Sequence, residues 1–68
     1  MNFFKQLRIA KKLSQEEVAD ATGLSQGLLS KVERGLPTSR VYLEKICAFY
    51  GVELDAIPNV RIRERNLR

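Results

Sequence analysis

Two serines and one glycine divide residues 14–35 into two short segments that can each form a helix. Ser14 precedes the sequence QEEVADAT and has Glu17 three residues later, which is the spacing of a capping box at the start of a helix. Gly23 can adopt the left-handed conformation that ends a helix. Ser25 then supplies a second N-cap before an apolar run. The pattern predicts two short helices joined by a turn, all within about twenty residues.

Apolar side chains recur about every 100° of helical rotation along four segments of the chain, which predicts four helices. Gly35 and Gly51 directly follow the last two of these segments, as expected of residues that end helices. We therefore predict an all-α, compact bundle of four to five helices, with residues 1–57 as one domain and residues 58–68 as a basic tail. The expected helices cover about residues 3–11, 14–22, 26–34 and 39–50, with a single further turn at about residues 54–57.

The small size of the chain limits how it can be stabilised. A chain of 68 residues buries a modest fraction of its surface, so it needs a compact helical core, a covalent or metal staple, or a partner chain. The single cysteine, Cys47, cannot form an internal disulfide, and the absence of histidine leaves no zinc site. We expect no metal and no cofactor, and a reducing, cytoplasmic setting fits best. The opening sequence MNFFKQLRIAKK is too charged for a signal peptide or a membrane span.

The residue types that usually carry catalysis are missing or isolated in this sequence. The chain contains no histidine, no nucleophile beside a base, no cluster of carboxylates and no glycine-rich loop that could hold a phosphate. We therefore expect a protein that is not an enzyme.

Positive charge is concentrated at the two ends of the sequence. The net charge is +4 and the isoelectric point is about 9.6, a range in which nucleic-acid binding is worth testing. The first 13 residues carry four cations and no acid, whereas residues 58–68 carry four arginines and one glutamate. Charge alone is weak evidence, since many small basic proteins are merely soluble.

The segment QGLLSKVER, residues 26–34, has one apolar and one polar face when it is drawn as a helix. On the polar face, the amide of Gln26 can bond an adenine edge and Lys31 can donate to a guanine. Gly27 removes bulk there and would let the helix approach the floor of a major groove. Taken alone, the same face could be a solvated surface with an incidental glycine. The apolar face holds Leu28, Leu29 and Val32, and the polar face holds Gln26, Gly27, Ser30, Lys31 and Arg34.

The stretch LRIAKKLSQEEVADATGLSQGLLSKVERG resembles the Cro and phage-repressor family of helix-turn-helix proteins, also called the XRE type. The matching motifs are LSQEEVA, TGLS and VERG, and the resemblance covers about residues 3–57. It implies a lambda-repressor-like bundle in which the second and third helices form the helix-turn-helix, and the third enters the major groove of double-stranded DNA. It also implies that Ala19 lies where these two helices pack and that Gly23 lies in the turn. The resemblance further implies burial of Leu24, Leu29 and Val32.

The same resemblance assigns roles to single residues. It implies that Arg8 and Glu33 bridge the first and third helices. Gly27 departs from the family pattern, because a side chain often reads a base at that position. Leu28 stands where relatives frequently carry a small polar residue, and it could extend the core or touch a thymine methyl. The implied base-reading residues are Gln26, Gly27 and Lys31.

A second group of polar residues is expected to contact DNA phosphates, which positions a protein without reading sequence. Several of these residues can also cap helices. Three of them belong to the loop before the fourth helix. The expected phosphate-contacting residues are Ser14, Gln15, Ser25, Ser30, Thr38, Ser39 and Arg40.

These observations predict a sequence-specific DNA-binding transcription regulator, most simply a repressor, that binds a palindromic operator as a homodimer. Repression would follow from occupying a promoter, and contact with polymerase is the other route by which it could act. The alternative is an antitoxin-like protein-binding module that masks a toxin and also binds its own promoter.

The end of the sequence has a different period. Val60 and Ile62 alternate with Arg61 and Arg63, as in a strand. We expect this strand to lack a partner within a helical chain, so it would either pair with the same strand of a second subunit or form a loose, disordered basic arm. Three aromatic residues of the fourth helix are expected in the core or at the dimer surface, namely Tyr42, Phe49 and Tyr50.

Overall fold

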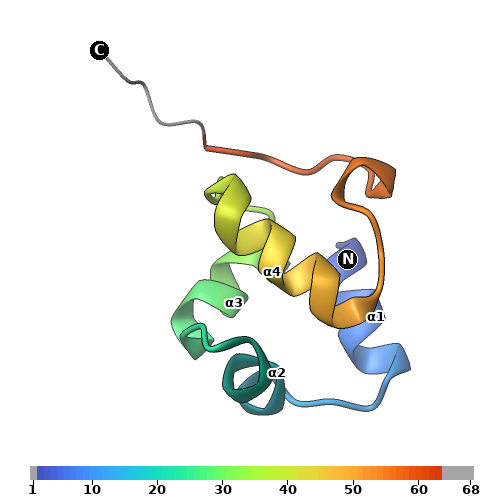
Figure 1. The fold of residues 1–68 in the computed structure, drawn as a ribbon, viewed down its shortest axis with the longest axis vertical. Coiled ribbons are helices and arrows are strands. Elements are labelled where there is room, and N and C mark those ends of the chain that lie inside the picture. The colour runs from blue at the N-terminus through green and yellow to red at the C-terminus, as the bar shows by residue number, and fades with distance from the viewer. Residues whose placement is uncertain (1, 64–68) are drawn as a thin grey trace.

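The computed structural model describes residues 2–63, and these form an all-α bundle. In Figure 1, α4 runs through the centre with α1 and α3 on either side, and α2 lies at the end of the bundle opposite the tail. The predicted fold class is therefore confirmed, and each helix begins and ends within about two residues of its expected limits. The elements are α1 (Phe3–Ala10), α2 (Gln15–Thr22), α3 (Gln26–Glu33), α4 (Arg40–Tyr50) and the short 3₁₀ helix η1 (Leu54–Ala56).

The predicted caps define the two central helices. The Ser14 side chain accepts a hydrogen bond from the Glu17 backbone N–H at 3.0 Å, and the Glu17 carboxylate accepts one from the Ser14 backbone N–H at 2.7 Å. Gly23 ends α2 in the left-handed conformation, with φ +74°. The Ser25 side chain then accepts a hydrogen bond from the Leu28 backbone N–H at 3.0 Å. These local bonds explain why two helices of eight residues each form with so short a turn between them.

All four helices contribute to one hydrophobic core. The side chains of Val18, Leu43 and Ile46 are the most deeply buried large ones. Ala19 is only 7 % exposed, and α2 packs closely on α3. The buried apolar residues are Phe4, Val18, Ala19, Leu29, Val32, Leu43, Ile46, Cys47, Tyr50, Leu54 and Ile57.

The tail segment up to residue 63 pairs with a loop of its own chain. The backbone N–H of Thr38 donates to the Arg61 carbonyl at 3.1 Å, and the backbone N–H of Arg63 donates to the Thr38 carbonyl at 2.8 Å. These bonds make a single parallel bridge between Thr38 and Ile62. The expectation that the segment has no partner within its chain is therefore wrong, because the extended loop before α4 offers unused backbone groups. Residues 64–68 of the predicted tail lie outside the described residues.

The alternation expected in the tail is present. Val60 and Ile62 are half-buried and pack against the core, whereas Arg61 and Arg63 are exposed. A period of two along extended backbone has this effect, because successive side chains point to opposite sides. The tail crosses the end of the bundle opposite α2, from η1 towards the side on which α3 lies (Figure 1).

Candidate nucleic-acid interface

The outward side of α3 carries the residues expected to read bases. Gln26, Gly27 and Lys31 are all exposed, while α3 buries Leu29 and Val32 against the core. A Cβ atom built at Gly27 would meet nothing within 4 Å. Packing within the chain therefore gives no reason for a glycine at this position.

A hollow of about 700 Å³ lies alongside this part of α3. Leu28 is half-buried and also lines this hollow, so its side chain faces both the core and the surface. The hollow brings Gly27 and Lys31 together with Ser30 and with Ser25, the N-cap of α3, whereas Gln26 is not among its lining residues. The lining residues are Gly23, Leu24, Ser25, Gly27, Leu28, Ser30, Lys31, Arg34 and Tyr42.

Tyr42 is the residue of this surface that sequence reasoning missed. Its helical spacing from Phe49 grouped it with the core or a dimer surface, yet Tyr42 is 42 % exposed and lines the hollow beside α3. The available signal was its place in the first turn of α4, directly after a loop expected to contact phosphate. A tyrosine there offers a hydroxyl that can donate to a phosphate oxygen.

Most of the residues expected to contact phosphate are at least partly exposed. Ser14, Ser25 and Arg40 are exposed, and Ser30 and Ser39 are half-buried. Ser14 and Ser25 already cap helices, whereas the Ser39 side chain makes no cap hydrogen bond. Arg40 faces Glu44 at 3.6 Å on an exposed part of α4, which is a weak pairing that leaves its charge usable.

Thr38 differs from the other residues expected to contact phosphate because it is buried. Its side chain is buried, with the residue only 4 % exposed, and its hydroxyl donates to the Leu36 carbonyl at 3.2 Å. The expectation of a phosphate contact from this hydroxyl therefore disagrees with the structure. The physical reason is the tail, whose pairing with the Thr38 backbone covers the residue.

An ion pair between Arg8 of α1 and Glu33 of α3 connects these two helices. Arg8 Nε donates to Glu33 Oε2 at 2.7 Å and Arg8 Nη2 to Glu33 Oε1 at 3.1 Å, so that the pair is bidentate. The Gln15 amide donates to the same Oε1 at 3.1 Å, and Arg8 Nη1 donates to the Leu13 carbonyl at 2.9 Å. The side chains of Arg8 and Glu33 are 14 % and 7 % exposed. The structure thus places the expected pair in contact and holds Gln15, at the start of α2, against the last residue of α3.

Two pKa shifts follow from this packing. The hydrogen bond to Glu33 raises the pKa of Arg8 above its ordinary value, so the guanidinium stays charged. Burial, followed by the nearby Glu33 carboxylate, raises the pKa of the Tyr50 phenol, which lies in the core next to the pair. Burial likewise raises the pKa of the Cys47 thiol, which is therefore a neutral core group, as its position on α4 indicated.

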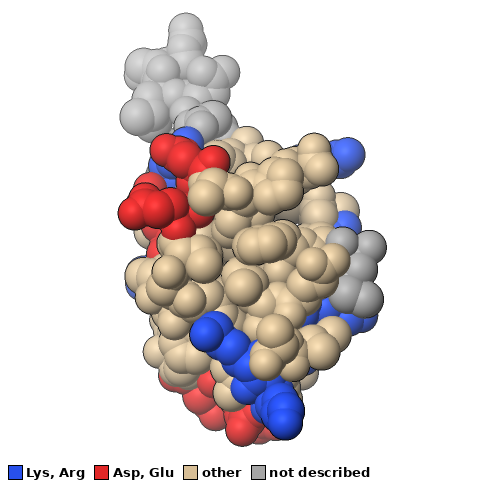
Figure 2. Space-filling model, turned by 90° about the vertical axis from the view of Figure 1, so that its right-hand side faces the viewer, with Lys and Arg blue, Asp and Glu red and all other residues tan. Residues whose placement is uncertain are grey.

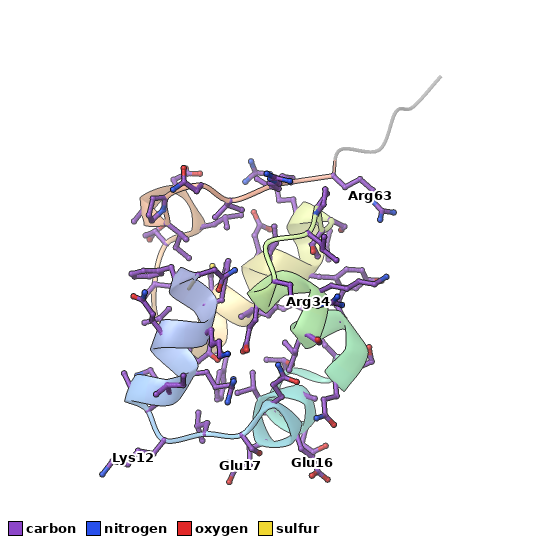
Figure 3. The ribbon with its side chains drawn as sticks, turned by 180° about the vertical axis from the view of Figure 1, so that it is seen from behind. Lys12, Glu16, Glu17, Arg34 and Arg63 are labelled. Atoms are coloured by element: carbon purple, nitrogen blue, oxygen red, sulfur yellow. The ribbon has the colours of Figure 1, made fainter. Side chains whose placement is uncertain are left out.

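Charge is unevenly distributed around α3. Figure 3 shows Arg34 and Arg63 on the side of α3, while Lys12 lies at the opposite edge, where the chain leaves α1. Glu16 and Glu17 lie together at the start of α2, where the helix dipole favours acids.

Within residues 2–63, no three His, Cys, Asp or Glu side chains are grouped so that they could hold a metal ion. In the same part of the chain, every helix is too short or too polar to cross a membrane.

The fold and this surface define a helix-turn-helix DNA-binding protein. Residues 4–57 match the helix-turn-helix family, and the chain belongs to that family, in its Cro and phage-repressor (XRE) branch. Members of the family are DNA-binding transcription regulators, and this chain is one of them. Comparison with curated proteins and with solved structures finds no match.

Proposed function

We propose that the protein is a cytoplasmic repressor that binds a palindromic operator as a homodimer, with α3 of each subunit in the major groove. The observation that carries this proposal is the exposed side of α3, where an amide, a cation and a bare backbone position stand together without any acid. Gln26 bonds the edge of an adenine, and Lys31 donates to the O6 and N7 acceptors of a guanine. Gly27 lets the helix backbone come closer to the bases than a larger residue would.

A dimer requires a self-complementary surface away from the reading side of α3. We place this surface at an open groove of about 410 Å³, next to the loop that follows α3. Phe3 and Leu36 line it and are 36 % and 40 % exposed. The tail residues Pro58 and Val60 complete its apolar wall. The groove lies beside the C-terminal end of α3 and excludes Gln26 and Lys31, so a second copy packed there leaves these residues uncovered.

The electrostatic character of the α1 and η1 side fits self-association. Figure 2 views this side of the molecule, and uncharged residues cover most of it, with cations in its lower middle and at its right margin and acids at the upper left and the bottom. Like charges would oppose a two-fold contact, so the uncharged central and upper part of this surface favours one.

Selection of bound duplexes from a random oligonucleotide pool tests the proposal directly. We expect enrichment of one motif that occurs as two inverted half-sites, with centres about one helical turn (~34 Å) apart. Placing the selected operator over a promoter should then reduce the output of a reporter gene when the protein is present. Failure to enrich any motif, or enrichment of isolated half-sites alone, would contradict the proposal.

A further inference from the structure

We infer that residues 60–63 form a second DNA-contacting element, in which Arg63 binds the phosphate backbone beside the groove that α3 enters. The inference rests on the proposed function and extends the interface beyond the helix-turn-helix itself. Neither the family match, which ends at residue 57, nor the resemblance of the sequence assigns a role to this segment.

The segment is held at both of its faces. Two backbone hydrogen bonds join Arg61 and Arg63 to the two sides of Thr38, and the half-buried Ile62 packs against the core. Thr38 itself is buried and lies two residues before the first residue of α4. The segment therefore has a fixed place on the loop where phosphate contacts were expected.

The two arginines of the segment are exposed to solvent. Because Ile62 points inward, Arg61 and Arg63 point away from the core, and both are exposed. Within residues 2–63 the two ion pairs are Arg8–Glu33 and Arg40–Glu44, so neither tail arginine is neutralised by one. Figure 3 shows Arg63 on the side of the molecule where α3 lies.

The chemistry of the guanidinium fits a phosphate. Arginine presents planar donors that bind two phosphate oxygens at once, and it stays charged at any physiological pH. Arg40, at the start of α4, directly follows the same loop, and its exposed pairing with Glu44 at 3.6 Å offsets its charge only weakly. Because the segment is already fixed by main-chain bonds, binding costs less conformational entropy than ordering a free arm would.

The salt dependence of DNA binding tests this inference on the full chain. We expect Arg63→Gln to lower the slope of log K against log salt by about 0.9 per subunit, or about 1.8 for the bound dimer, equally on the selected operator and on random duplex. For the dimer, over a fourfold rise in salt this amounts to a difference of about twelvefold in affinity relative to the parent. Lys12→Asn is the matched control, since it removes one cation at the far edge and asparagine tolerates the positive φ of 59° found there.

A second pair of variants separates a fixed contact from general attraction by a mobile arm. Ile62→Asn keeps the net charge but removes the side chain that holds the segment on the core. For a fixed contact, this variant loses the same slope as Arg63→Gln, and the double variant loses no more. A full slope retained by Ile62→Asn, or equal losses for Arg63→Gln and Lys12→Asn, would overturn the inference. If the parent protein binds no DNA, the proposed function fails instead, so the two failures are distinguishable.

Discussion

Gly27 occupies a helical, exposed position where neither backbone strain nor packing requires a glycine. We predict that Gly27→Ala raises the free energy of unfolding by about 0.5–1 kcal/mol, because alanine loses less backbone freedom in a helix. The same methyl group should weaken operator binding by holding α3 away from the bases. Chemical denaturation and fluorescence anisotropy with the selected duplex measure the two effects. A variant that is more stable and binds as tightly as the parent would show that Gly27 is incidental.

Gln26 and Lys31 should differ from phosphate contacts in how they respond to sequence. Replacing either with alanine should cost ~1–3 kcal/mol of binding free energy on the selected operator and much less on random duplex. The reason is that a base contact exists only where the matching base is present. Titrations of both variants against both duplexes measure this difference. Equal losses on the two duplexes would assign these side chains to contacts with the DNA phosphates, and Ser14→Ala, at an expected phosphate contact, is the comparison for which equal losses are expected.

At the scale of elements, the Arg8–Glu33 pair joins α1 to α3 and reaches α2 through Gln15. Removing one partner leaves the other charge mostly buried and unpaired, at a cost on the order of 3 kcal/mol. We therefore predict that Arg8→Met and Glu33→Leu are each more destabilising than the two changes combined. Denaturant unfolding of the parent, both single variants and the double variant completes the cycle. Additive effects would reduce the pair to independent surface charges.

The helices themselves could be predicted from the sequence because their signals are local. Ser14 with Glu17 and Gly23 after the apolar run set the limits of α2 through bonds that span only a few residues. The apolar face of α3 likewise identified Leu29 and Val32 as core residues. Local capping and periodicity are the parts of a fold that a single sequence records most directly.

The tail and one part of the interface could not be predicted, because both depend on contacts between distant segments. The bridge from Thr38 to Ile62 joins residues that carry no matching pattern, and it buried a hydroxyl that residue type alone assigned to phosphate. Tyr42 has the same helical spacing as core residues, and only the folded arrangement shows that it is exposed and lines the hollow beside α3. Conversely, the contact between Arg8 and Glu33 was expected from the resemblance, and the structure shows it.

At the scale of the whole molecule, we predict that the dimer depends on the groove beside α3. Phe3→Glu places a charge in that groove at the first position of α1, where a helix tolerates an acid well. Sedimentation without DNA should therefore show monomers that remain folded by circular dichroism. Val41→Glu is the matched control, because it also adds an acid to the first turn of a helix, at a residue 60 % exposed and outside the groove. A dimer that survives Phe3→Glu would place the interface elsewhere.

The stability of the molecule should also fall at alkaline pH. Burial raises the pKa of both Cys47 and Tyr50, so the folded state holds these protons more tightly than the unfolded chain does. Their contribution to stability is complete below the pKa values of the unfolded chain and is lost as the pH rises through the folded values. We expect the free energy of unfolding to decline above about pH 9, and less steeply in Cys47→Ala. Identical pH profiles for parent and variant would contradict a role for the thiol.

The burial of Cys47 has a practical consequence for experiments on this protein. A thiol that is 3 % exposed, with a raised pKa, reacts slowly with maleimides and disulfide reagents while the chain is folded. A cysteine introduced on the surface would therefore take a fluorophore selectively, with no need to remove the native one. The slow modification of Cys47 itself then reports how often the native core opens, since the sulfur becomes reactive only in molecules that have opened. The rate at which Cys47 is modified therefore measures the opening of the core without any added label.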